Sequence, residues 1–451
     1  MPDPEAPTHH EVPPDGEPAL APITHAPIAR AALRGWLFRV GFVYWIVYAG
    51  TLVLSSFDLP VLRLGNDALS WLLRTLDLWV GHHVLGLTEI AVDPTGSGDR
   101  MIDWIELAIT LGLALVIGSV WAGLDRRRAH DARLRAVLRV VVRYGLGFSL
   151  LYYGVSKIVG FQFQPPSDGQ LLKTWGESSP MNVLWTFIGA SPAYQMFGGI
   201  AETLGGALVL FRRTTLLGAL VVAGVMLNVV LLNFCYDVPV KLGSSHLLAM
   251  SIVLILPDAR RLLDLLVRGR GVAPPAAPLP PVLAGRRWRI ARAVVKLAVI
   301  ANMLIVIGRG LRRGDDAGPP PWLAGAWLVS SFTRDGHEAV ASDAARWDRL
   351  TVQAYNGELY ARVRLARANG PAYGVKVDDA AHTLAFTDKA APNAAPVTWR
   401  AARDPGDPTH LALSGAIDGH PVEIKLERFD ADKLLLRSRG FHWISEAPFN
   451  R

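Results

Sequence analysis

The chain has 451 residues, of which 51% are hydrophobic, and its mean hydropathy is +0.26. This composition exceeds the usual soluble average and predicts an integral membrane protein. The formal charge is +7, but arginine is clustered between apolar runs, which is typical of membrane orientation signals and not of nucleic-acid binding. The single cysteine, Cys235, excludes an internal disulfide, a CxxC redox pair and a cysteine-based zinc site.

The first 30 residues are rich in proline and have no apolar core of a signal peptide, so we expect a disordered tail. Residues 31–136 then hold two apolar runs, at about 36–56 and 102–122. The loop between them has room for a short surface helix. Its "DPTGSGDR" segment lacks the Lys-Ser/Thr of a phosphate-binding loop, and we expect it to form a turn in which Ser97 or Asp99 caps the second run.

Five further apolar runs follow. Four of them fall within residues 137–270, at about 137–158, 194–211, 214–234 and 243–259. A proline-rich linker, 271–290, leads to a last run at about 293–309, within residues 291–310. About 20 residues cross a ~30 Å hydrocarbon core, so these runs predict six or seven transmembrane helices.

The basic loops predict the orientation. They follow the second run, surround Arg212 and Arg213, and extend from Arg260 to Arg292. If the spans alternate, all three lie on one side, which is then the cytoplasmic side. We therefore expect a multi-pass protein of the cell (inner) membrane, with a cytoplasmic N-terminus and an extracytoplasmic region after about Gly308.

Residues 320–451 predict a separate β domain. About nine short segments alternate apolar and polar residues, the last being "KLLLRSRGFHW", and they are separated by Asp335-Gly336, Asn356-Gly357, Asn369-Gly370 and Asp418-Gly419. This pattern indicates an antiparallel β-barrel or sandwich. Gly325-x-Trp327 resembles the first-strand signature of lipocalin-like barrels, which leaves a ligand cavity open. The aromatic ending "RGFHWISEAPFNR" either docks the domain onto the helices or forms a strand and a closing tail.

Several spans carry polar groups, which cost ~2.5–3.5 kcal/mol each when ionisable and usually face a bundle interior. Glu202 lies ~12 Å into its span at 1.5 Å per residue. With the orientation above, the polar residues of the other spans fall in the same outer half of the membrane. The candidate site therefore consists of Glu202, Lys157, His246, Asn228, Tyr153 and Glu106.

Glu202 sits among glycines that favour close helix contact. Gly198 and Gly205 share one face, as do Gly199 and Gly206, and Glu202 lies on that packed side. Its carboxyl is either a proton relay and hydrogen-bond partner for a quinone head group, or a structural partner of Lys157 or His246.

Two segments carry a family resemblance. "GLGFSLLYYGVSKIVGFQF" resembles the first helix of the DoxX family, and "GIAETLGGALVLFRRTTLLGALVVAGVML" resembles its next pair of helices. The resemblance covers about 137–266 and implies a four-helix membrane bundle in which Lys157 and Glu202 occupy two recurrent charged positions. DoxX-like proteins are associated with membrane oxidoreductase assemblies, including quinone-linked ones.

The function expected from these features is a membrane subunit or scaffold of an envelope redox or stress-response assembly, with a quinone or lipid in the outer half of the bundle. The alternative is a non-enzymatic anchor whose β domain recognises a lipid or protein partner, and a small-molecule transporter is a third. The sequence shows no metal-ligand cluster, nucleotide fingerprint or Ser-His-Asp spacing, so whether the chain is an enzyme stays open.

Overall fold

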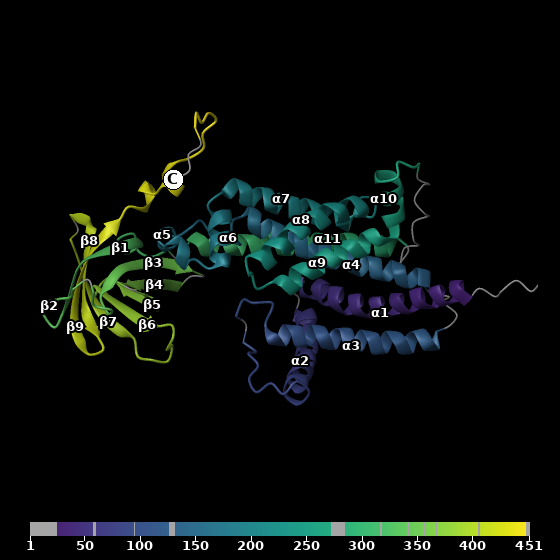
Figure 1. Ribbon diagram of the computed structural model, residues 1–451, viewed down its shortest axis with the longest axis horizontal. Coiled ribbons are helices and arrows are strands. Elements are labelled where there is room, and N and C mark those ends of the chain that lie inside the picture. The colour runs from purple at the N-terminus through teal and green to yellow at the C-terminus, as the bar shows by residue number, and fades with distance from the viewer. Residues whose placement is uncertain are drawn as a thin grey trace, which may run out of the picture.

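The helical part and the β domain lie end to end in the computed structural model (Figure 1). The structure describes residues 25–56, 60–93, 95–125, 131–271, 285–315, 318–340, 342–355, 358–366, 368–404 and 406–447. Most of the predicted tail, most of the predicted linker and the Asn356-Gly357 turn lie outside these residues.

The helical part is built from long helices that run roughly parallel to the long axis of the molecule (Figure 1). Its helices are α1 (His25–Ser55), α2 (Pro60–His83), α3 (Met101–Leu124), α4 (Asp131–Ile158), α5 (Asp168–Leu171), α6 (Pro180–Gly189), α7 (Pro192–Leu210), α8 (Thr215–Cys235), α9 (Lys241–Ile255), α10 (Ala259–Leu266) and α11 (Arg286–Asp315). Among the described residues, four stretches are long and apolar enough to cross a membrane: Ala32–Ser55, Met101–Leu124, Thr215–Cys235 and Lys241–Leu266. They match four of the predicted spans. The other three predicted spans fall on α4, α7 and α11, which are helical but outside this set, so the seven-span count stays a prediction.

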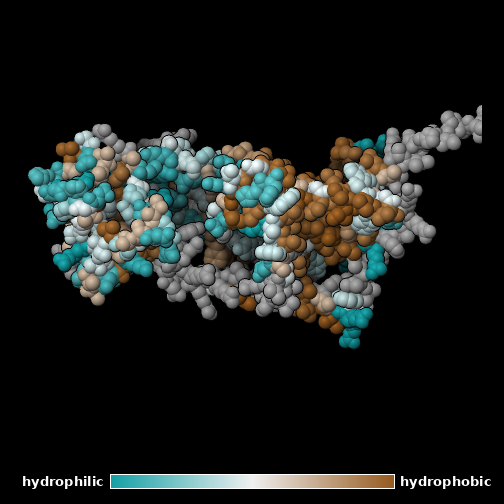
Figure 2. All heavy atoms as spheres, turned by 90° about the horizontal axis from the view of Figure 1, so that it is seen from below, coloured by the Kyte–Doolittle hydropathy of each residue, from teal (hydrophilic) through white to brown (hydrophobic). Residues whose placement is uncertain are grey.

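The apolar stretches face outward. Only 11% to 28% of each is buried inside the protein. Figure 2 shows hydrophobic side chains covering much of the helical part and mainly hydrophilic ones covering the β domain. An apolar surface of this extent is stable in lipid, and this supports a membrane protein.

The core of the bundle joins five helices. Its buried side chains come from α1, α4, α7, α8 and α9, and they are Ala49, Val142, Leu146, Leu150, Val209, Ala219, Val222, Met226, Leu247, Met250 and Leu254. α1 is held closely, since a Cβ on Gly145 would lie 2.9 Å from the carbonyl oxygen of Ala49. The first span therefore packs into the same core as the segment with the family resemblance.

The loop after α1 contains a longer helix than expected. α2 has 24 residues and crosses the direction of α3 (Figure 1). Trp71, Leu72 and Trp79 are exposed on it, whereas Asp77 and Gly81 are buried. An apolar face on a helix that crosses the bundle suits the membrane–water interface.

The β domain is a closed barrel and not a sandwich. Its strands are β1 (Gly325–Arg334), β2 (His337–Glu338), β3 (Trp347–Tyr355), β4 (Glu358–Leu365), β5 (Asn369–Asp378), β6 (Thr383–Asp388), β7 (Val397–Asp404), β8 (Asp407–Ile417) and β9 (His420–Phe429). Neighbouring strands pair antiparallel in the order β2-β1-β3-β4-β5-β6-β7-β8-β9, and β1 also pairs with β9. The β1–β9 pairing closes eight strands into a barrel and leaves β2 as an appendage of β1.

Buried side chains fill the described interior of the barrel. Trp327, Phe332 and Leu350 are each at most 1% exposed. The rings of Trp347 and Trp399 lie 5.3 Å apart. The barrel is thus a packed core of its own, as the alternating sequence pattern predicts.

Two of the predicted turns are confirmed by their backbone angles. Asp335 and Gly336 have φ of 52° and 78°, and Asp418 and Gly419 have φ of 51° and 80°. A two-residue hairpin turn needs this left-handed conformation at both positions, which Asp-Gly adopts readily.

The prediction of a strand in "KLLLRSRGFHW" is wrong. Residues 431–433 form a short 3-10 helix and Leu435–Ser438 form the helical turn α12. β9 already pairs with both β8 and β1, so no barrel edge is left for another strand. Phe441 and Trp443 are 77% and 92% exposed, so the aromatic ending does not dock the barrel onto the helices through these rings.

Candidate functional site

An ion pair between α4 and α7 lies at the centre of the candidate site. Lys157 Nζ is 2.5 Å from Glu202 Oε1, and the two side chains are 12% and 3% exposed. The second carboxyl oxygen, Glu202 Oε2, is buried and has no hydrogen-bond partner among the described residues. Gln195 donates to the Lys157 carbonyl at 3.0 Å and fixes the end of α4 against α7. The pair is therefore tightly positioned but leaves one acceptor of Glu202 unused.

Glycines allow α4 and α7 to approach closely at this pair. A Cβ on Gly199 would lie 2.6 Å from the Gly154 carbonyl oxygen, and one on Gly206 would lie 3.0 Å from that of Gly147. Nothing lies within 4 Å of the Cβ position of Gly198. The predicted contact of Gly199 and Gly206 is thus confirmed, whereas Gly198 lies outside it.

His246 has a different partner from the one predicted. Its Nδ1 donates to the Leu242 carbonyl at 2.7 Å, so in a neutral ring Nε2 is the acceptor. Nε2 is hydrogen-bonded to the hydroxyl of Tyr44, which is the donor in that state. Glu202 pairs with Lys157 instead, so a Glu202–His246 contact is not part of the structure.

Aromatic residues of α1 surround this histidine. The Tyr48 ring stacks on the His246 ring with centroids 4.2 Å apart, and Trp45 meets it edge-on at 6.3 Å. Tyr44, Trp45 and Tyr48 lie within about one helical turn, so one side of α1 forms the aromatic surroundings of His246. Sequence reasoning missed these residues.

Tyr48 and Tyr153 lie on the same packed helices as other candidates. Tyr48 of α1 stacks on the His246 ring, and Tyr153 of α4 precedes Lys157 by one turn. The helices α1, α4, α7 and α9 share one buried core, and they carry four of the six predicted residues: Glu202, Lys157, His246 and Tyr153. These four residues, with Tyr44 and Tyr48, are called the outer polar network below. Glu106 lies on α3, which contributes no residue to this core cluster.

Asn228 does not join the outer polar network. It is exposed on α8, and within the described part of the chain it makes no side-chain hydrogen bond to the network. Asn233, on the same helix, is only 6% exposed and has a buried Nδ2 without a partner. The two differ by five residues, which places them on different faces of the helix.

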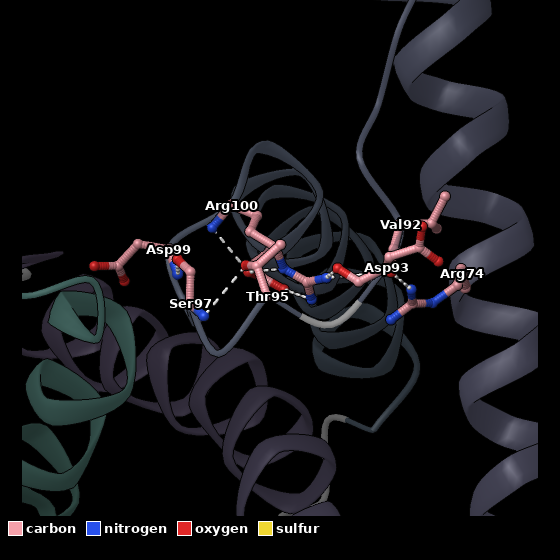
Figure 3. Close-up of polar contacts among 8 residues, drawn as sticks. Arg74, Val92, Asp93, Thr95, Ser97, Asp99 and Arg100 are labelled. Atoms are coloured by element: carbon pink, nitrogen blue, oxygen red, sulfur yellow. Dashed lines mark hydrogen bonds and ion pairs between the residues drawn. The ribbon is translucent and has the colours of Figure 1, made fainter. Parts of the chain in front are cut away.

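The "DPTGSGDR" loop holds this end of the bundle together (Figure 3). Arg100 binds the Asp103 carboxylate and the carbonyls of Val92 and Asp93, and Arg74 of α2 also donates to Val92. The N-cap of α3 is Arg100 and not Ser97 or Asp99.

Asp99 caps a different helix from the one expected. Its carboxylate accepts hydrogen bonds from the backbone N–H groups of Lys241 and Leu242, at 2.7 Å and 2.9 Å. These are the first residues of α9, so the carboxylate satisfies open donors at the helix N-terminus. Since His246 lies one turn further along α9, the loop helps to position it.

The barrel is fixed to the loop that follows Lys157. Arg364 forms two hydrogen bonds with Glu177, at 2.6 Å and 2.7 Å, and Arg349 donates to the Leu172 carbonyl at 2.7 Å. Arg437, beyond the barrel, pairs with Asp168 at 2.7 Å. The Arg364 hydrogen bonds lower the pKa of Glu177 to about 2.

The outer polar network offers a defined set of chemical groups. Lys157 and the hydroxyls of Tyr48 and Tyr153 are donors, Glu202 has an unused oxygen, and Tyr48 presents an aromatic ring. These groups suit a ligand with carbonyl oxygens and a planar ring.

One known protein resembles this chain over most of its own length. YwoB of Bacillus subtilis (strain 168), described as an uncharacterized protein, is 32% identical over 137 residues, which are 87% of YwoB and 30% of this chain. The chain belongs to the YwoB family. No family model and no solved structure matches it. Relative to YwoB, most of this chain lies outside the shared segment.

Proposed function

We propose that this YwoB-family chain is a DoxX-like subunit or scaffold of an envelope redox or stress-response assembly, and that its outer polar network binds a quinone. The observation that carries the proposal is the buried, unpartnered oxygen of Glu202 beside Lys157. A buried polar atom without a partner is costly, and a ligand or proton relieves that cost.

The residues present fit a quinone head group. Its carbonyl oxygens need donors, which Lys157 and Tyr153 supply, and its ring needs an apolar or aromatic surface, which Tyr48 supplies. When bound, a quinone supplies electron and proton transfer, and the chain's own residues bind and orient it.

The test is ligand retention. Full-length protein purified in mild detergent is extracted, and quinone is measured by mass spectrometry. We expect bound quinone or quinol, with quinol reduced about tenfold in Glu202→Gln, because a quinol hydroxyl donates to the charged carboxylate and a hydrogen bond to a charged group contributes about 1.5–3 kcal/mol. Asn228→Ala, a polar change outside the network, should retain the wild-type amount. Absence of quinone, with no thermal stabilisation when it is added, would overturn the proposal.

We further propose that the network lies toward the extracytoplasmic side. Cys235 provides the test because it is exposed and ends α8 at the same end of the bundle as the network. A membrane-impermeant maleimide should label Cys235 in intact spheroplasts. In a Cys235→Ser background, Arg213→Cys should be labelled only after permeabilisation. The reverse pattern would overturn the proposed orientation.

A second candidate function is assembly through the barrel region, supported by the exposed aromatic rings of Phe441 and Trp443 that follow the barrel. Deletion of residues 320–451 should then abolish co-purification of a protein partner while the helices stay folded. Unchanged co-purification would rule this function out.

A further inference from the structure

A second acidic site lies between α2 and α3. Asp77 is on the face of α2 that packs on α3, where a Cβ on Gly81, one turn later, would lie 3.3 Å from Ile105. The Asp77 residue is only 2% exposed, and its Oδ1 is buried without a hydrogen-bond partner among the described residues. A carboxyl buried in this way is rare unless it is paired or protonated.

The charged groups around Asp77 leave it without a counter-ion. Glu106, Asp103 and Arg74 interact with it electrostatically. Asp103 is already held by Arg100 through two hydrogen bonds, of 3.0 Å and 2.9 Å, and Figure 3 shows the Arg74 guanidinium directed to the Val92 carbonyl. Glu106 directly follows Ile105, which lies near Gly81 one turn after Asp77, so both carboxyls are at the same contact between α2 and α3. Neither has a hydrogen-bonded or ion-paired cation in the described part of the chain.

We propose that Asp77 and Glu106 form a proton-binding site that holds one shared proton near neutral pH. Two close carboxyls in a poorly solvated place cannot both ionise, so the second proton is retained. Asp77 is buried whereas Glu106 is exposed at the protein surface, so the shared proton is stored on Asp77.

Burial, followed by the charge of Glu106, raises the pKa of Asp77 to about 7, and Arg74 opposes this rise. The proton site does not depend on a quinone, so it stands even if the ligand-retention experiment finds none.

Infrared spectroscopy of the full-length protein in lipid discs tests the site. A protonated carboxyl gives a C=O stretch separate from the carboxylate bands, and it is followed between about pH 5 and about pH 9. We expect a band that disappears with a midpoint near pH 7. Asp77→Asn should remove this band, and Glu106→Gln should lower its midpoint by on the order of one pH unit, because a neighbouring negative charge is lost.

Asp237→Asn is the matched control, because this carboxylate is at the same end of the bundle but exposed and paired with Lys241. It should leave the band unchanged. The proposal is overturned if the band is absent, if it persists in Asp77→Asn, or if its midpoint moves with sodium or potassium concentration, which would indicate a metal cation at the site. If Asp77→Asn does not fold, the Glu106→Gln variant still tests the proposal. A midpoint of its infrared band equal to that of the wild type would exclude a shared proton.

Discussion

The Lys157–Glu202 pair puts two opposite charges where each depends on the other. Neither side chain is more than 12% exposed, so water cannot solvate either charge well. A buried pair is often no more stable than an apolar replacement of both partners, but removal of one partner leaves an uncompensated charge.

This dependence predicts a non-additive double mutant. Lys157→Met should lower the free energy of unfolding by about 3 kcal/mol, because Glu202 is left without its counter-ion. Lys157→Met/Glu202→Gln should recover most of that loss. Unfolding of the purified protein in mixed micelles, followed by circular dichroism, gives both values. Additive losses in the double mutant would mean that the two side chains act independently.

The pair could be predicted from the sequence because both charges fall at similar depth in neighbouring spans. The partner of His246 could not, because Tyr44 precedes it by 202 residues and depth alone does not identify a contact. A signal was present, since Tyr44 and Tyr48 lie one turn apart on one face of the first span. Depth alone also does not specify the helical face, and Asn228 lies on an exposed face of α8.

At the scale of elements, glycines set the distance between α4 and α7. Gly154 and Gly199 meet backbone to backbone, and the ion pair lies one turn further on each helix. The sequence predicted this packing from the seven-residue spacing of glycines, but spacing gave two equivalent faces. Only the neighbouring helix decides which face is the packed one.

Two substitutions separate these faces. Gly199→Leu should destabilise the protein by at least about 1–3 kcal/mol, because the new side chain meets the Gly154 carbonyl oxygen at 2.6 Å. Gly198→Leu should change stability by less than about 0.5 kcal/mol, because its Cβ position is open. The same micellar unfolding assay measures both. Equal effects would contradict the assigned packing face.

The ends of helices and of the barrel were predicted less accurately from the sequence than the presence of the helices and strands themselves. Asp99 caps α9 and not the adjacent α3, since the loop turns back across the end of the bundle. The final strand was predicted from local alternation, yet strand formation needs a free edge. In both cases the decisive partner is distant in the sequence.

For the whole molecule, the arginine contacts determine how the barrel sits on the helices. Arg364, Arg349 and Arg437 all reach the segment 166–177, which begins nine residues after Lys157. The barrel is thus attached to the segment that follows the outer polar network in the chain.

This attachment should depend on pH. The folded protein lowers the pKa of Glu177 from an ordinary 4.5 to about 2, so the stabilisation is fully present above about pH 4.5 and is lost as the pH falls toward 2. Labels on Cys235 and on a cysteine replacing His337 should report a broader distance distribution between helices and barrel at low pH, measured by electron paramagnetic resonance. Glu177→Gln should be broad already at neutral pH. A narrow distribution in that variant would contradict a role for this contact.

The pairing of β1 with β9 has a consequence for how the protein is made. Residues 326–334 of β1 can complete their pairing only after residues 422–429 of β9 have been synthesised, because this pairing closes the barrel. Until then both edges are open, and open edges pair with other chains. Barrel closure therefore comes only after nearly the whole polypeptide has been synthesised. A chain that ends before His420 would expose the open edges of β1 and β8 and would be prone to aggregate and to be degraded.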